Sequence, residues 1–208
     1  MSNNKVITKC IYVDLSNLYG GIAELFSAGI YIDFSTLMPL LDEIFNGIDQ
    51  YKVYGAYMGY SEDMPIYKKE FVKAQNEFFN SAKLANVYFG QGRISKFNQE
   101  KGVDMQLGVD MVNDAHNNSY TDYILFSGDA DFDYPIQIIK SLGKNFHYCG
   151  FANRFAKSFS YKAWKKVVID YNGHFAKTIV PKTKLPKKLI IKDIYKNNTI
   201  KIKSVSLI

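Results

Sequence analysis

The chain has 208 residues and a mass of 23.8 kDa, which fits one well-cored domain with an appendage better than two full domains. Hydrophobic residues make up 47% of the sequence and aromatic residues 15%, so the composition excludes wholesale disorder. No stretch approaches the roughly 20 apolar residues of a membrane helix, and the N-terminus MSNNKVITKC lacks the apolar run of a signal peptide. We therefore expect a cytoplasmic protein with no membrane partner.

The formal net charge of +6 is unevenly spread along the chain. From Lys177 to the C-terminus there are nine lysines and one acidic residue, Asp193, whereas the preceding 176 residues hold 17 basic and 19 acidic residues. This shift predicts a domain over residues 1–176 and a basic extension over residues 177–208. The extension either attracts phosphates or only adds a solvated, basic surface. Its last part regains an apolar/polar rhythm and could end in a strand or hairpin.

Short apolar, β-branched runs alternate with helix-like segments along the chain. The runs are continuous rather than alternating, which indicates strands that are covered on both faces and hence a largely parallel sheet. The predicted strands cover residues 10–15, 52–60, 86–90, 122–128, 145–151 and 166–170. The predicted helices cover residues 35–45, 65–78, 103–116 and 135–143. This order predicts an α/β fold, a three-layer α/β/α sandwich around an open, mainly parallel sheet.

Acidic residues follow two of the predicted strands. In an open parallel sheet the ligand site lies beyond the carboxyl ends of the strands. Asp14 ends the first strand, and Asp129, Asp131 and Asp133 follow the fourth within five residues. Capping of the next turn would explain one such acid. It would not explain three, because carboxylates crowded into a poorly solvated pocket repel one another unless a hard cation binds them.

A further acidic residue, Asp104, lies in the first turn of the third predicted helix, after Lys101 and Gly102. From this position its carboxylate projects from the same edge as the strand ends. Asp110 lies about one and two-thirds turns further along and on another face of the helix. We therefore rank Asp104 as the better metal ligand, with Asp110 and Asp133 as weaker candidates.

These motifs, taken in their order, resemble a known family. They are Asp-x-x-Asn over residues 14–17, Lys-Gly-Val-Asp-(x)5-Asp over residues 101–110, and Ser-Gly-Asp-x-Asp-Phe over residues 127–132. Together they look like the NYN domain of the LabA-like family, which is one of the PIN-like nucleases. The resemblance spans about residues 8–171 and leaves the basic extension outside it.

The resemblance implies catalytic roles for Asp14, Asp104, Asp129 and Asp131. The first three would bind Mg²⁺ or Mn²⁺, and Asp131 would bind a second ion or act as a base toward water. The implied activity is that of a metal-dependent endoribonuclease that hydrolyses phosphodiester bonds of RNA.

The resemblance also implies that Asn17 and Ser127 shape the pocket of this site. One departure from the family motif is Ala130, which stands where the family usually has serine. The acids keep their places, but a role for that hydroxyl in contacting substrate is in doubt.

Substrate binding is expected from cations close to the acidic edge. Arg93, Lys96 and Lys101 lie in the stretch that leads to Asp104. In the same region, Tyr88 and Phe97 offer ring faces on which unpaired bases could stack. The partner would be single-stranded or structured RNA, and a homo-oligomer remains open.

Two other functions fit parts of the pattern. A non-catalytic RNA-binding or interaction module could keep the same fold, although such a module would be expected to lose carboxylates that repel one another. A haloacid-dehalogenase-like phosphatase shares the sheet type and a first-strand aspartate. That class needs a second aspartate two residues after the first, where this sequence has Ser16.

Overall fold

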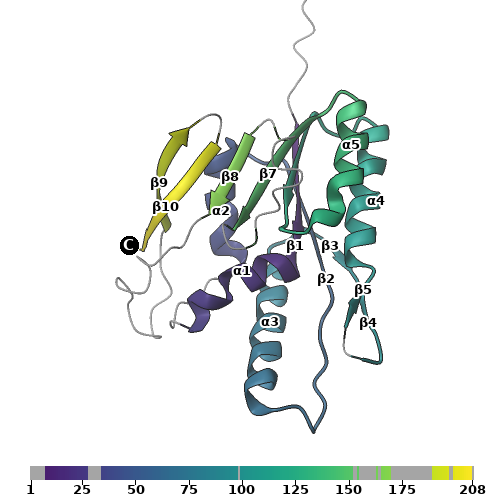
Figure 1. Ribbon diagram of the computed structural model, residues 1–208, viewed down its shortest axis with the longest axis vertical. Helices are drawn as coiled ribbons and strands as arrows, with labels where there is room; N and C mark the ends of the chain where they lie inside the picture. The colour runs from purple at the N-terminus through teal and green to yellow at the C-terminus, as the bar shows by residue number, and fades with distance from the viewer. Residues whose placement is uncertain are drawn as a thin grey trace, which may run out of the picture.

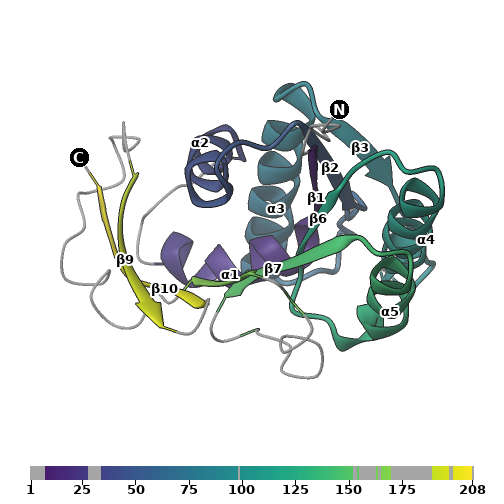
Figure 2. The same cartoon turned by 90° about the horizontal axis from the view of Figure 1, so that it is seen from above.

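The computed structural model describes residues 8–27, 34–97, 99–151, 154, 163, 165–169, 189–196 and 199–207. Within them, one eight-stranded sheet is flanked by helices on both faces (Figure 1 and Figure 2). The predicted α/β sandwich with an open, mainly parallel sheet is confirmed.

The main sheet has the strand order β3-β2-β1-β6-β7-β8-β10-β9. All neighbouring strands run parallel except β9 and β10, which pair antiparallel. The strands are β1 (Lys9–Asp14), β2 (Gln50–Gly55), β3 (Tyr88–Gln91), β6 (Asp122–Phe126), β7 (Asn145–Phe151), β8 (Lys165–Ile169), β9 (Leu189–Lys196) and β10 (Thr199–Leu207). The chain leaves β1 toward β2 and β3 and later places β6 and β7 on the other side of β1. The strand order therefore reverses between β1 and β6.

The helices form the two outer layers, as the view from above shows (Figure 2). Helices α1, α2 and α3 cover one face of the sheet, and α4 and α5 cover the other. The helices are α1 (Leu15–Ser27), α2 (Phe34–Phe45), α3 (Ile66–Leu84), α4 (Val103–His116) and α5 (Asp133–Ser141). The four predicted helices are present as α2 to α5, and Gly143 follows α5 with a φ of 72°, as expected for a glycine just past a helix end. Helix α1 was not predicted.

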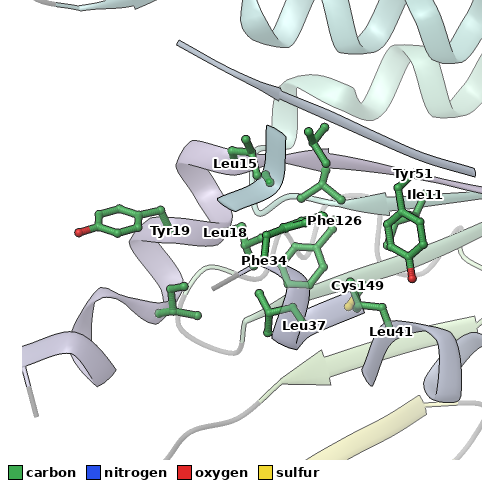
Figure 3. Close-up of a cluster of buried hydrophobic side chains, with 14 of the residues drawn as sticks. Ile11, Leu15, Leu18, Tyr19, Phe34, Leu37, Leu41, Tyr51, Phe126 and Cys149 are labelled. Atoms are coloured by element: carbon green, nitrogen blue, oxygen red, sulfur yellow. The ribbon is translucent and has the colours of Figure 1, made fainter. Parts of the chain in front are cut away.

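Side chains of each central strand pack into two separate cores. Ile11 and Val13 of β1 belong to the core under α1, α2 and α3, whereas Cys10 and Tyr12 belong to the core under α4 and α5. Figure 3 shows part of the first core, in which Phe34 of α2 lies against Phe126 of β6. Because both faces are buried, these strands need apolar residues at every position, which explains the continuous runs in the sequence.

The second predicted strand is shorter than expected. We predicted it over residues 52–60, but β2 ends at Gly55. After it, the backbone N–H of Ala56 donates to Glu100, and the backbone of Met58 is held by the side chain of Asn76. These side-chain partners replace the ladder bonds that would have continued the strand.

A small hairpin and the C-terminal strands complete the described part of the chain. The hairpin consists of β4 (Arg93–Ile94) and β5 (Glu100–Lys101), which pair antiparallel ahead of α4. The expected strand or hairpin at the C-terminus is present as β9 and β10, with β10 parallel to β8. The predicted boundary between residues 176 and 177 lies outside the described residues. Within them, no helix is long and apolar enough to cross a membrane.

Candidate active site

Asp14, the last residue of β1, lies in a network that joins two chain segments. Its side chain is buried, with 5% exposed. One carboxylate oxygen accepts a hydrogen bond from the backbone N–H of Asn17 at 2.9 Å, and the other accepts from the Ser127 hydroxyl, also at 2.9 Å. The Ser127 hydroxyl in turn accepts from the backbone N–H of Asp129 at 3.1 Å. This network ties the turn after β1 to the turn after β6, at the point where strand order reverses.

Burial and neighbouring charges make Asp14 a weak acid. Burial raises its pKa to about 7 against the hydrogen bonds from Asn17 and Ser127, which act to lower it. The negative charges of Asp104 and Glu100 also contribute to this raised pKa. The ionisation of Asp14 therefore depends on the charges of both acids.

Asp129 and Asp131 follow β6 in a short 3₁₀ helix, η1 (Ala130–Phe132). The Asp129 carboxylate accepts from the backbone N–H of Asp131 at 3.0 Å and so caps this turn. Asp131 is exposed. Asp133 lies one step further, in the first turn of α5, where its carboxylate accepts from the side chain of Gln137 at 2.7 Å.

Asp104 comes to the same edge from α4. Gly102, with a φ of 82°, occupies the cap position, and Asp104 lies in the first turn that follows. Partial burial raises the pKa of Asp104, and the charges of Asp129 and Asp131 raise it further. Asp14, Asp104, Asp129 and Asp131 therefore lie at the same edge of the sheet, where Asp104 interacts electrostatically with the other three. Asp110 lies apart from them and accepts hydrogen bonds from Tyr54 at 2.9 Å and Tyr88 at 3.4 Å.

Sequence reasoning missed Glu100, a fifth acidic residue of this edge. Its carboxylate accepts from the Ser16 hydroxyl and from the backbone N–H of Ala56, both at 2.9 Å. These bonds pin the β4–β5 hairpin to the carboxyl ends of β1 and β2. Burial raises the pKa of Glu100, and the charge of Asp104 adds to this effect. The residue stands in a short basic stretch between helices, and nothing in that pattern distinguished it from a solvated loop acid.

Arg154 is a second residue that the sequence did not single out. A Cβ atom on Gly20 of α1 would lie 2.7 Å from the central carbon of its guanidinium group, so this group lies directly against α1. A Cβ atom on Gly128 would lie 1.7 Å from the Arg154 carbonyl oxygen. Only glycine fits at Gly128, next to Asp129. The Arg154 backbone therefore lies beside Gly128, and its exposed side chain extends to Gly20 of α1.

The predicted substrate-binding cations lie on the hairpin. Arg93 pairs with Lys101 across the two strands, and both side chains are exposed. The Lys96 ammonium lies 5.1 Å from the centre of the Phe97 ring, which is 73% exposed. Tyr88 is less available than expected, since its hydroxyl bonds to Asp110 on α4.

The oxygen ligands of this edge suit a hard divalent cation, but they are not gathered around one point. Among the described residues, no three histidine, cysteine, aspartate or glutamate side chains are arranged to hold a metal ion. The Oδ1 atom of Asn17 is buried and has no hydrogen-bond partner among the described residues. A buried oxygen left without a donor beside Asp14 is the kind of atom that a cation or an ordered water would satisfy.

Three comparisons place the chain among known proteins. The sequence model of the NYN domain matches residues 9–170. A search of the curated proteins gave no significant match. Among solved structures, a protein of unknown function from Vibrio parahaemolyticus is similar, with a TM-score of 0.58 and 16% identity over 81% of this chain and 96% of that one. At this identity the similarity shows the fold alone.

Proposed function

Because the chain belongs to the NYN domain family of the PIN-like nuclease superfamily, we propose that it is a metal-dependent endoribonuclease of the LabA-like branch. The observation that carries the proposal is the convergence of Asp14, Asp104, Asp129 and Asp131 where strand order reverses. The charge of Asp104 helps to raise the pKa of Asp14, and the charges of Asp129 and Asp131 help to raise the pKa of Asp104. Like charges held this close are costly in the absence of a cation.

The carboxylates of Asp14, Asp104 and Asp129, with the amide oxygen of Asn17, would hold Mg²⁺ or Mn²⁺. All four provide oxygen atoms, which these cations prefer, and Asp104 lies near the surface. When bound, the cation would lower the pKa of a water molecule and offset negative charge on the phosphate.

The remaining residues of the site have separate roles in phosphodiester hydrolysis. Ser127 and the backbone of Asn17 fix the orientation of Asp14 through the two bonds that its oxygens accept. Asp131 is exposed beside Asp129 and would accept the proton of the attacking water. Arg154 would bind a non-bridging phosphate oxygen from the α1 side. No side chain needs to act as a nucleophile.

RNA would approach over the β4–β5 hairpin. Arg93, Lys96 and Lys101 are exposed there, and Phe97 offers a free ring face. Cations that neutralise the backbone, combined with an aromatic face that stacks on unpaired bases, are typical of single-strand recognition. The hairpin's attachment through Glu100 keeps these groups beside the acids.

A cleavage assay tests the proposal directly. Labelled single-stranded RNA, double-stranded RNA and DNA are incubated with the protein in Mn²⁺, Mg²⁺ or EDTA, and the products are separated on a gel. We expect internal cleavage of RNA with metal and none with EDTA. Asp104→Asn should lower the rate at least about 100-fold, because the variant loses a ligand charge and keeps the side-chain shape.

Glu43→Gln is the matched control, since Glu43 is an exposed acid of α2 that belongs to none of the groups described above. It should cleave at the wild-type rate. RNA binding without cleavage in any metal would instead identify a non-catalytic binding module. Wild-type cleavage by Asp104→Asn would show that the reaction uses another centre.

A thermal assay tests the metal separately from turnover. A ligand that binds only the folded state adds RT ln(1 + [L]/Kd) to stability, about 2.7 kcal/mol at a concentration of 100 Kd. Millimolar Mn²⁺ should therefore raise the Tm of the wild type, and the rise should be smaller in Asp104→Asn. An equal Tm with Mn²⁺ and with EDTA would contradict the assigned ligands.

A further inference from the structure

Helices α4 and α5 lie side by side in both views of the molecule (Figure 1 and Figure 2). Residues of both helices line a groove between them. The groove has a volume of about 620 Å³. Its floor forms where the helices approach most closely: a Cβ atom on Gly108 would lie 3.2 Å from Pro135, beside the buried ring of Phe132. The volume falls within the range of pockets that hold small organic ligands, roughly 300–1,000 Å³.

One end of the groove opens on the candidate active site. Asp104 of α4 and Asp131 of η1 belong both to the acidic edge and to the groove lining. A strand whose phosphate lies at these acids therefore has the groove immediately beside it. Among the residues that the structure describes, no lysine or arginine lines the groove, so they provide no cation there for a second phosphate.

The walls of the groove are apolar and open to solvent. Met105, Val109 and Tyr134 are 72%, 55% and 70% exposed, although large apolar side chains normally avoid water. The polar side chains of Asn113 and His116 line the groove further along α4. This combination of apolar walls, one aromatic ring and a few hydrogen-bonding groups suits a flat heterocycle with polar edges.

We propose that the α4–α5 groove is a nucleobase-binding subsite for the nucleotide next to the scissile phosphate. The inference rests on the proposed function, because it places that phosphate at the acids. The base enters past Asp104 and Asp131, its face contacts Tyr134 and the apolar wall, and its edge is turned along α4 toward Asn113. Only an unpaired base can leave its helix in this way, so the subsite selects single-stranded RNA.

Two variants alter the walls without touching the acids. Tyr134→Ala removes the ring, and Val109→Asp adds a negative charge that repels RNA from the groove. Each should raise KM for single-stranded RNA about tenfold, because the first loses the stacked ring and the second repels the strand. The kcat at saturating RNA should stay within about twofold. Tyr67→Ala is the control. Tyr67 is 68% exposed, and it belongs to α3, the helix that covers the other face of the sheet.

A binding measurement keeps the groove testable even if the protein cleaves no RNA. RNA with 2-aminopurine at successive positions is titrated into Asp14→Asn, a background that removes a buried acid outside the groove lining. Fluorescence should be quenched at one position only, and the added change Tyr134→Ala should abolish that quenching. In kinetics, an abasic nucleotide at the same position should raise KM of the wild type and leave KM of Tyr134→Ala unchanged.

The outcomes separate the two proposals. Loss of cleavage by the wild type in every metal would refute the nuclease function, and the quenching pattern would still decide the subsite. Quenching at no position, or wild-type KM in folded Tyr134→Ala and Val109→Asp, would overturn the subsite. If Val109→Asp converts a dimer into a monomer in sedimentation and leaves KM unchanged, the groove binds a second copy of the chain and not a base.

Discussion

Asp14 shows how much of the site depends on one buried carboxyl group. Each of its two oxygens accepts one hydrogen bond, from Asn17 and from Ser127, yet burial still leaves its pKa near 7. A group with this pKa is part protonated at neutral pH. Anything that brings positive charge to the edge will release that proton, because the ionised form is then favoured.

This raised pKa predicts a pH-dependent stability in EDTA. Below about pH 4 Asp14 is protonated in both the folded and the unfolded state, so it does not lower the free energy of unfolding. Between about pH 4 and 7 the unfolded chain releases the proton and the folded chain keeps it, so stability falls as pH rises, by up to about 1.4 kcal/mol per pH unit. Above about pH 7 Asp14 is ionised in both states, so the free energy of unfolding stops falling.

The comparison that isolates this group is Asp14→Asn, which is always neutral and can still hydrogen-bond Ser127 or Asn17. The Tm difference between wild type and variant, measured from pH 5 to 8 in EDTA, should shift in favour of the variant up to about pH 7 and then level off. Parallel Tm curves over that range would mean that Asp14 ionises in the folded state as it does in a free peptide.

At the scale of elements, the β4–β5 hairpin links the substrate-binding cations to the acids. Its two strands have two residues each, and its attachment depends on the bonds that Glu100 accepts from Ser16 and Ala56. Glu100 also raises the pKa of Asp14 through its charge. It therefore acts as a positioning residue with an electrostatic effect on the site.

Removing that charge should shift the pH dependence of cleavage. Glu100→Gln keeps an oxygen acceptor but lowers the pKa of Asp14, so the acid limb of the pH–rate profile should move to lower pH while the Tm changes little. A role limited to holding the hairpin would lower the rate equally at every pH. Glu70→Gln, an exposed charge of α3, is the control and should keep the wild-type profile.

Elements with regular patterns were predictable, and those shaped by tertiary contacts were not. Helix α1 was not predicted, and it contains Gly20 and Gly21, which have low helix propensity. Both glycines lie inside the helix because Arg154 and Phe151 occupy the space that a Cβ would need, at 2.7 and 1.9 Å respectively. The hairpin was missed because two-residue strands carry no periodicity.

At the scale of the whole molecule, the basic extension joins the same sheet as the body. Strand β10 pairs with β8 over four residue pairs, from Thr199 with Lys166 to Ile202 with Ile169. Without β10, the edge of β8 would expose unpaired backbone groups. Deleting residues 177–208 should therefore lower the Tm of the whole domain, which circular dichroism can measure.

A gentler change tests whether the extension also binds phosphate. Replacing Lys182, Lys184, Lys187 and Lys188 with glutamine keeps the strands and removes four charges ahead of β9. If these lysines contact RNA, the slope of log K against log salt should flatten by about 0.7 per lost contact for a single strand. The same change at Lys68, Lys69, Lys73 and Lys83 of α3 is the control. An unchanged slope in a folded variant would leave the extension a structural role alone.

The sequence by itself determined the sheet type, four of the helices and the acids of the site, because each of these depends on local chemistry. Continuous apolar runs require strands buried on both faces, and a carboxylate at a strand end is visible in the sequence. Only the tertiary structure brought Glu100 to the acidic edge and Arg154 against Gly20 and Gly128, because these positions depend on contacts between residues far apart along the chain. The groove between α4 and α5 likewise depends on the packing of two helices, with Gly108 against Pro135, that no sequence pattern pairs.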